Sequence, residues 1–139
     1  MTDNLDIRWK QRFKNFDRAF LLMRQALERG PEVLNQLEKE GVVQRFEYSF
    51  KLAWKTAKDY LEQGGFVFAI ITPRHVIKES FAAKLIIDGQ VWIDMLDHRN
   101  LLSHTYSSAS FEEAVQAITI RYLPAMEALH EFFHSESSK

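Results

Sequence analysis

The sequence contains no cysteine among its 139 residues. This absence excludes disulfide bonds, thiol nucleophiles, and zinc or iron–sulfur sites with cysteine ligands, and it suits a reducing compartment. Long apolar runs are absent as well, since no window reaches the roughly 18 apolar residues of a membrane span. The N-terminal stretch MTDNLDIRWK also lacks the apolar core of a signal peptide. We therefore expect a soluble, cytoplasmic protein that does not enter membranes.

A net charge of either sign is also nearly absent. Lysine and arginine number 18 against 19 acidic residues, a formal charge of -1. No global field therefore attracts nucleic acid or membrane, so any such binding depends on a local patch, and we expect no DNA-specific binding. With 46% hydrophobic residues, the chain suits one domain with a buried core over residues 1–139, ending in a short polar tail from about residue 135.

Apolar residues recur instead at the spacing of helices. A stripe from Trp9 to Leu27 predicts an amphipathic first helix. After a short segment broken at Gly41, a second stripe from Phe46 to Leu61 predicts another helix. That helix stops at the glycine pair that follows it.

The middle of the chain predicts a connection and two shorter helices. Residues 66–71, FVFAII, have strand propensity but no partner strand, so we expect an extended connection packed on the bundle. Thr72 followed by a proline predicts an N-cap and a helix through about Leu85. Asp88 begins the next helix.

The last helix has its own start signal. Ser110 and Glu113 match a capping box, and an apolar stripe from Val115 to Phe133 follows them. Pro124 predicts a local kink in this helix. Together these patterns predict an all-α fold, an antiparallel bundle of four or five helices.

The stretch DHRNLLSHTYS, residues 97–107, concentrates polar side chains at the end of the fourth predicted helix. Arg99 falls on the apolar face of that helix, where a permanently charged guanidinium needs a carboxylate, an interface or an anionic ligand. Asp97, Asn100 and His104 fall on the opposite side. Arg99 and His104 stand about 140° apart on a regular helix. They converge only if the helix ends between them or if a second subunit supplies one of them.

This set of side chains fits anion recognition and metal-independent cleavage of RNA. As candidate catalytic residues, His104 exchanges a proton with a ribose 2′-hydroxyl or the leaving oxygen, and Arg99 binds phosphate oxygens. Asp97, Asn100 and Tyr106 are candidate substrate-binding residues, Tyr106 by stacking on a base. We expect no metal site and no cofactor. The structural alternative pairs Arg99 with a buried carboxylate, while His104 caps or ends the helix.

Three blocks, RFEYSFKLAWKTAKDYLEQGG, TPRHVIKESF and WIDMLDHRNLLSHTY, resemble the nucleotidyltransferase substrate-binding protein family in their order and residues. That family belongs to the HEPN superfamily, named for higher eukaryotes and prokaryotes nucleotide-binding. The superfamily signature is an arginine, usually followed by a polar residue, and a histidine a few positions later. Arg99, Asn100 and His104 match this signature, and Tyr106 matches the tyrosine of its extended form.

The resemblance implies more than a fold. Family members are small helical bundles that form homodimers and are encoded beside a minimal nucleotidyltransferase, which lacks a substrate-binding domain of its own. Related HEPN proteins are metal-independent ribonuclease toxins with the arginine and histidine at the dimer interface. In some toxin–antitoxin pairs the nucleotidyltransferase neutralises the toxin by modifying the tyrosine of the motif, here Tyr106.

Three functions follow as hypotheses. We favour a subunit that binds nucleotide or RNA for a minimal nucleotidyltransferase. The alternatives are a HEPN-type ribonuclease toxin neutralised by that partner, and a non-catalytic dimerisation module in which Arg99 completes an interface ion pair. Ile93 and Leu101 lie away from the core face of the fourth helix, so we expect a homodimer to bury them.

Other polar residues have simpler interpretations. The second helix carries a row of lysines on one face, Lys51, Lys55 and Lys58. This row can follow a phosphate backbone, but a solvated face explains it more simply, and the basic residues around the first helix are also interpreted as solubilising. His75 near a helix start can have a ligand or a carboxylate partner. His130 and His134 have metal-ligand spacing, although an exposed pair is the favoured interpretation.

Overall fold

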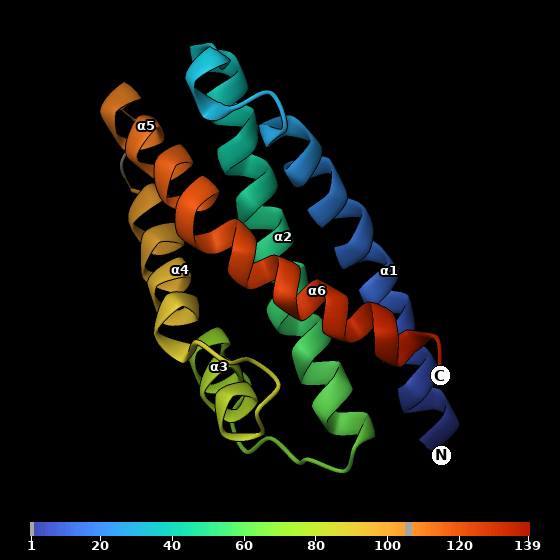
Figure 1. The fold of residues 1–139 in the computed structure, drawn as a ribbon. Helices are drawn as coiled ribbons and strands as arrows, with labels where there is room; N and C mark the ends of the chain where they lie inside the picture. The colour runs from blue at the N-terminus through green and yellow to red at the C-terminus, as the bar shows by residue number, and fades with distance from the viewer. Residues whose placement is uncertain (1, 105–106) are drawn as a thin grey trace.

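The computed structural model describes residues 2–104 and 107–139, which are mainly helical and contain no strand (Figure 1). The elements are α1 (Thr2–Leu27), a 3-10 turn η1 (Pro31–Val33), α2 (Gln36–Gln63), α3 (Pro73–Ala82), α4 (Gly89–Leu102), α5 (Ser108–Ala117), a π-helical turn η2 (Ile118–Tyr122) and α6 (Leu123–Ser137). Because α5, η2 and α6 continue into one another as a single rod, the described chain is a bundle of five helical rods. The predicted all-α fold is confirmed.

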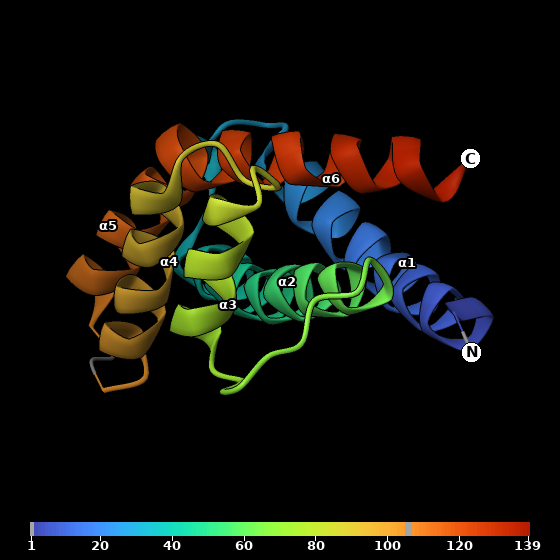
Figure 2. The same ribbon diagram turned by 90° about the horizontal axis from the view of Figure 1, so that it is seen from below.

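The two long helices α1 and α2 lie antiparallel and side by side (Figure 1). The rod formed by α5, η2 and α6 crosses this pair, and α6 packs against α1. The shorter α3 and α4 pack on each other, and α4 also contacts η2 (Figure 2). In the part of the chain that the structure describes, no helix is both long and apolar enough to cross a membrane.

The predicted apolar stripes form the core of the bundle. The stripe on α1 is buried throughout and consists of Trp9, Phe13, Phe16, Phe20, Met23 and Leu27. Phe46 and Phe50 of α2 are also fully buried, as are Met126 and Phe133 of α6. Each fully buried side chain of this kind stabilises the fold by roughly 1.5–3 kcal/mol. The helical periodicity therefore identifies the core correctly.

Side chains cap several helix starts. The side chains of Thr72 and Asp88 accept hydrogen bonds from the backbone N–H groups of their own helices, as predicted. The predicted capping box at Ser110 is wrong. Ser107 is the N-cap of α5, because its backbone is extended and its Oγ accepts the N–H of Ser110 at 3.1 Å. The helix therefore begins at Ser108, before the residue chosen from the sequence.

Two other helix boundaries also differ from the sequence prediction. Gly41 does not break a helix, because α2 begins at Gln36 after a capping box and continues through Gly41. A glycine in a helix costs only about 1 kcal/mol, which the cap and the packing offset. The third helix ends at Ala82 instead of Leu85, since Lys84 adopts a positive φ of 62°.

The irregularity expected at Pro124 takes the form of the π-helical turn. The N–H of Leu123 reaches back five residues to the carbonyl of Ile118, directly before a proline that has no N–H to continue the ladder. In the connection 66–71, Phe68 packs against the core while Val67 and Ile70 are exposed. The prediction that this segment packs on the bundle therefore holds for Phe68 and fails for its exposed neighbours.

Candidate functional site

The polar motif lies on the last turns of α4, at the end that leads into α5 (Figure 1). Trp92, Met95 and Leu102 are buried and hold this helix against the bundle, as their spacing predicts. The backbone positions of the motif are therefore set by packing. Its polar side chains extend from a fixed helix.

Arg99 is half-buried and lies over an aromatic ring. Its guanidinium carbon is 5.8 Å from the centroid of the Phe50 ring on α2, and its Nη2 donates a hydrogen bond to Oδ1 of Asn100 at 3.0 Å. No ion pair joins Arg99 to any described residue. Burial raises the pKa of Glu47, and the positive charge of Arg99 opposes that shift. Within the described chain, Arg99 therefore forms no salt bridge with a buried carboxylate, although its charge acts on the half-buried carboxylate of Glu47.

His104 lies just beyond the end of α4. The helix ends at Leu102, and the backbone N–H of His104 donates to the carbonyl of Leu101 at 3.0 Å. Its imidazole is exposed. The helix thus ends between Arg99 and His104, which was one of the two conditions for their convergence. Among the described residues, however, no hydrogen bond joins the two side chains.

The three candidate substrate-binding residues have different surroundings. Asn100 is next to the guanidinium of Arg99 and accepts its hydrogen bond. Asp97 instead accepts a hydrogen bond from Nη2 of Arg74 on α3 at 2.7 Å, and both of these side chains are exposed. Tyr106 lies outside the described residues. The structure therefore brings Asn100 to Arg99 and ties Asp97 to a neighbouring helix.

The sequence analysis assigned no role to His98. Its Nδ1 is 3.0 Å from the hydroxyl oxygen of Tyr122, a residue of η2. Burial lowers the pKa of His98, and the charge of Glu113 opposes this shift. Burial likewise raises the pKa of Tyr122. His98 shares helical spacing with the buried Met95 and Leu102, and that spacing is the signal from which its partly buried position could have been inferred.

The other histidines have structural partners. Nε2 of His130 is 2.6 Å from Oδ1 of Asp17, and the His130 ring is buried and stacked on Phe20. The interpretation of His130 as half of an exposed pair is therefore wrong, because α1 supplies both a carboxylate and an aromatic ring. Nε2 of His75 is 3.9 Å from a carboxylate oxygen of Glu79. The described residues contain no group of three or more histidine and acidic side chains placed to hold a metal ion.

The described chain is a small all-α bundle with an arginine, an asparagine and an exposed histidine at the end of one helix. Comparison with known proteins gives the family. A model described as "Nucleotidyltransferase substrate binding protein like" matches residues 11–135. The chain belongs to this family, as the sequence blocks predict.

One sequence relative and two solved structures are similar to this chain. A protein of Haemophilus influenzae named "Probable ribonuclease HepT" is 29% identical over 84 residues, which cover 55% of this chain and 54% of that protein. The match thus spans about half of that relative. A Haemophilus influenzae structure described as the fold of a substrate-binding domain of a nucleotidyltransferase is 25% identical, with a TM-score of 0.74 over 88% of this chain and 98% of the other. A structure from Thermus thermophilus is 28% identical, with a TM-score of 0.68 over 82% of this chain and 94% of the other.

Proposed function

We propose that this chain is the substrate-binding subunit of a separate minimal nucleotidyltransferase and that it binds nucleotide or RNA through Arg99, Asn100 and His104. The observation that carries the proposal is the environment of Arg99. Its guanidinium lies over an aromatic ring and makes no ion pair with the described residues. A permanent cation with these partners is ready to bind an anionic group such as a phosphate. Family membership supports the same function.

Copurification tests the partnership. The tagged chain is expressed together with a minimal nucleotidyltransferase from the same genome, which we expect in the neighbouring reading frame. We expect the two proteins to elute as one complex. A partner that elutes separately, although both proteins are folded, contradicts a subunit role.

Replacing Arg99 tests the binding site. We expect Arg99→Ala to weaken binding of a fluorescent ATP analogue by at least about ten-fold, because a charge-assisted hydrogen bond is worth roughly 1.5–3 kcal/mol. Fluorescence anisotropy measures affinity, and circular dichroism verifies that helicity is unchanged. Arg29→Ala is the matched control, since it removes the same charge from an exposed position that contacts no residue of the motif. Equal affinities for the wild type and Arg99→Ala would place the nucleotide elsewhere, and loss of helicity would give Arg99 a structural role.

A second candidate function is metal-independent cleavage of RNA. The exposed imidazole of His104 and the relative named as a probable ribonuclease favour it. In this reaction His104 removes the proton of a ribose 2′-hydroxyl, and the 2′-oxygen forms a bond to the adjacent phosphorus as the bond to the 5′-oxygen breaks. The 5′-oxygen takes a proton from water, and the products are a 2′,3′-cyclic phosphate and a free 5′-hydroxyl. Arg99 binds the negative charge that develops on phosphate. Purified wild-type chain incubated with total RNA and a chelator should then produce RNA fragments. The His104→Ala variant should leave the RNA intact. RNA that stays intact with the wild type would contradict this function.

We also propose that the chain forms a homodimer through α4. Leu101 on this helix is 59% exposed, whereas Ile93 is half-buried against the core. An exposed leucine beside the motif is suited to an interface. Light scattering of the purified chain should report the mass of two copies at micromolar concentration. A monomer at that concentration would remove any site shared between subunits.

A further inference from the structure

The adjoining sides of α1 and α2 both carry cations. The residues of this basic face are Arg8, Arg12 and Arg18 on α1, and Arg45, Tyr48, Lys51, Lys55 and Lys58 on α2. Two carboxylates, Asp59 and Glu62, accompany them. The sequence showed the same lysines and arginines but not that the antiparallel packing of the two helices brings them to one face.

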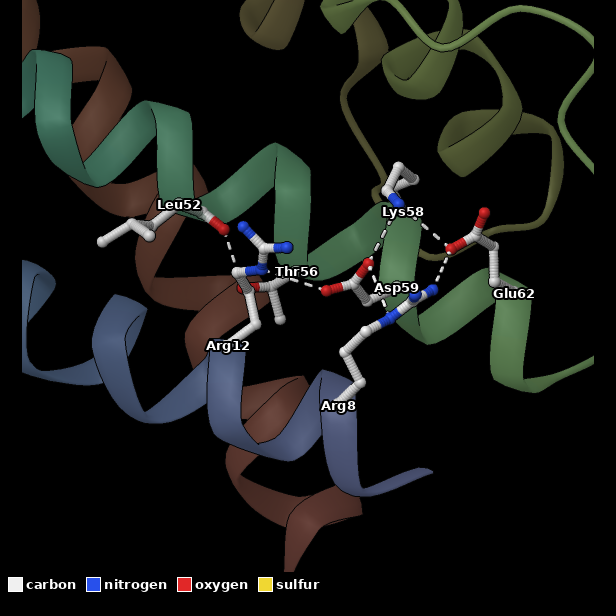
Figure 3. Close-up of polar contacts among 7 residues, drawn as sticks. All are labelled: Arg8, Arg12, Leu52, Thr56, Lys58, Asp59 and Glu62. Atoms are coloured by element: carbon white, nitrogen blue, oxygen red, sulfur yellow. Dashed lines mark hydrogen bonds and ion pairs between the residues drawn. The ribbon is translucent and has the colours of Figure 1, made fainter. Parts of the chain in front are cut away.

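One end of the basic face is anchored by a buried carboxylate (Figure 3). The Asp59 side chain is fully buried, and it forms ion pairs with Arg12 at 3.0 Å, Lys58 at 3.1 Å and Arg8 at 3.6 Å. Arg8 and Lys58 also pair with Glu62. These contacts hold the long cationic side chains in place between the two helices, so less conformational entropy is lost when they bind an anion.

The middle of the basic face carries two lysines without an ion pair. Within the described chain, Lys51 and Lys55 make no ion pair. Burial lowers the pKa of Lys55, the charges of Lys51, Arg12 and Lys58 lower it further, and the charge of Asp59 opposes the shift. That repulsion shows that these cations share one region of space. An anion bound between them would relieve it.

The other end of the face contains an aromatic hollow. Tyr48 is 55% exposed, and it lines a cavity of about 110 Å³ together with Asn15, Arg18, Leu22 and Arg45. The cavity is several times the roughly 30 Å³ that one water molecule occupies in the liquid. Nη1 of Arg45 donates to the carbonyl of Leu22 at 2.9 Å, which holds this guanidinium at the cavity wall. An exposed tyrosine ring beside arginine and amide side chains is the environment in which an unpaired nucleobase stacks and forms hydrogen bonds.

We propose that the basic face is a second nucleic-acid site that binds single-stranded RNA, with one base in the hollow at Tyr48 and the phosphates along Lys51 and Lys55. Tyr48 and Lys58 are about 15 Å apart along α2, which accommodates a short run of nucleotides. A base inside a duplex is stacked between its neighbours and cannot enter the hollow, so a single strand is the preferred ligand. The inference goes beyond the proposed function because it uses no residue of the Arg99 motif.

Fluorescence anisotropy with a fluorescein-labelled oligouridylate tests this site on the full chain. Tyr48→Ala should weaken binding at least about five-fold, because stacking of a base on an aromatic ring is lost. The double variant Lys51→Gln/Lys55→Gln should reduce the slope of log affinity against log salt by about 1.4, or about 0.7 for each phosphate contact on a single strand. The matched control is Lys78→Gln/Lys84→Gln, which removes the same charge from exposed positions around α3 and should bind as the wild type does. All of the replaced side chains except Lys55 are exposed, and circular dichroism verifies folding.

Several outcomes overturn the inference. These are a wild-type chain that does not bind the oligouridylate at low salt, and a Tyr48→Ala chain that binds it with unchanged affinity. Duplex RNA or polyglutamate that binds as tightly as the single strand would show a general polyanion surface. If Arg99→Ala abolishes binding while Tyr48→Ala leaves it intact, the proposed function stands and this second site falls. If Tyr48→Ala weakens RNA binding while Arg99→Ala has no effect on any ligand, the second site stands and the proposed function of the Arg99 motif falls.

Discussion

At the scale of single residues, Asp59 shows how a buried charge joins two helices. Its carboxylate has no exposure and three cationic neighbours, while the cations themselves keep contact with solvent. Oδ1 of Asp59 accepts no hydrogen bond within the described chain, so it is held by charge alone, whereas Oδ2 accepts one from Arg12. Such an arrangement is costly to break because the charge has no other compensation in the interior.

Replacing this carboxylate should therefore weaken the packing of α1 against α2 and destabilise the fold. We expect Asp59→Asn to lower the free energy of unfolding by about 1–3 kcal/mol, less than for a fully buried pair because water can solvate the remaining cations. Urea denaturation followed by circular dichroism measures the change. Glu62→Gln is the control, since Glu62 is more exposed and should cost less. Equal stability of Asp59→Asn and the wild type would contradict the anchoring role.

His98 makes stability depend on pH. Because burial lowers its pKa in the folded state, the unfolded chain binds a proton more readily than the folded chain does. The stability that neutral His98 contributes is thus complete above the unfolded-state pKa near 6.5 and is lost as the pH falls through the lower folded-state pKa. We expect His98→Gln to lose less stability on acidification than the wild type, measured by urea denaturation over a pH series. His134→Gln, at an exposed position, should follow the wild type, and identical pH profiles for all three proteins would reject this role for His98.

At the scale of the helices, α2 contains a glycine in its interior, although the sequence predicts a helix break at this residue. Gly41 has helical neighbours on both sides, and a Cβ added there meets no atom within 4 Å. Gly65, after the end of the helix, has a φ of 102° that other residues rarely adopt. The same residue type therefore has opposite roles inside and beyond one helix.

Alanine at these two positions should give opposite changes. Gly41→Ala should raise the free energy of unfolding by about 0.5–1 kcal/mol, because alanine loses less backbone entropy in a helix. Gly65→Ala should lower it by about 1–2 kcal/mol, because a Cβ is strained at positive φ even where space is open. Thermal or urea denaturation of the two variants gives the comparison. A destabilised Gly41→Ala protein would mean that the glycine has a role other than helix continuity.

At the scale of the whole molecule, one chain presents Arg99 and His104 without joining them. Arg99 lies against α2, and His104 lies beyond the end of α4 in solvent. A ligand that spans both residues is one way to complete the site. The other is the proposed homodimer, in which one copy contributes the arginine and its partner the histidine.

Mixing two inactive variants distinguishes these arrangements. If the site is shared between subunits, Arg99→Ala and His104→Ala proteins that exchange subunits should regain cleavage or nucleotide binding, because each heterodimer holds one site with both residues intact. Each variant alone is the control and should stay inactive. No recovery after verified exchange contradicts a site that needs one residue from each subunit. Full activity of either variant by itself would show that the residue it lacks is not needed.

The sequence by itself determines the helices, the core and the family of this protein. Periodicity identifies the buried stripes of α1, α2 and α6, and the caps at Thr72 and Asp88 mark two helix starts, because these signals act within a few residues of chain. The motif at Arg99 can likewise be recognised from the sequence, because its residues lie within a few positions of one another. Where local signals compete, as among the serines before α5 and at Gly41, the sequence misplaces the boundary.

Only the tertiary structure decides which side chains meet. The helical pattern of a sequence shows on which side of its helix a residue lies. It does not show which other helix packs against that side. Packing therefore decides that Phe50 lies under Arg99, that Asp17 meets the His130 ring, and that Asp59 pairs with cations from two helices. The basic face has the same origin. Its charges are evident in the sequence, but they form one surface only because α1 and α2 lie antiparallel along most of their length.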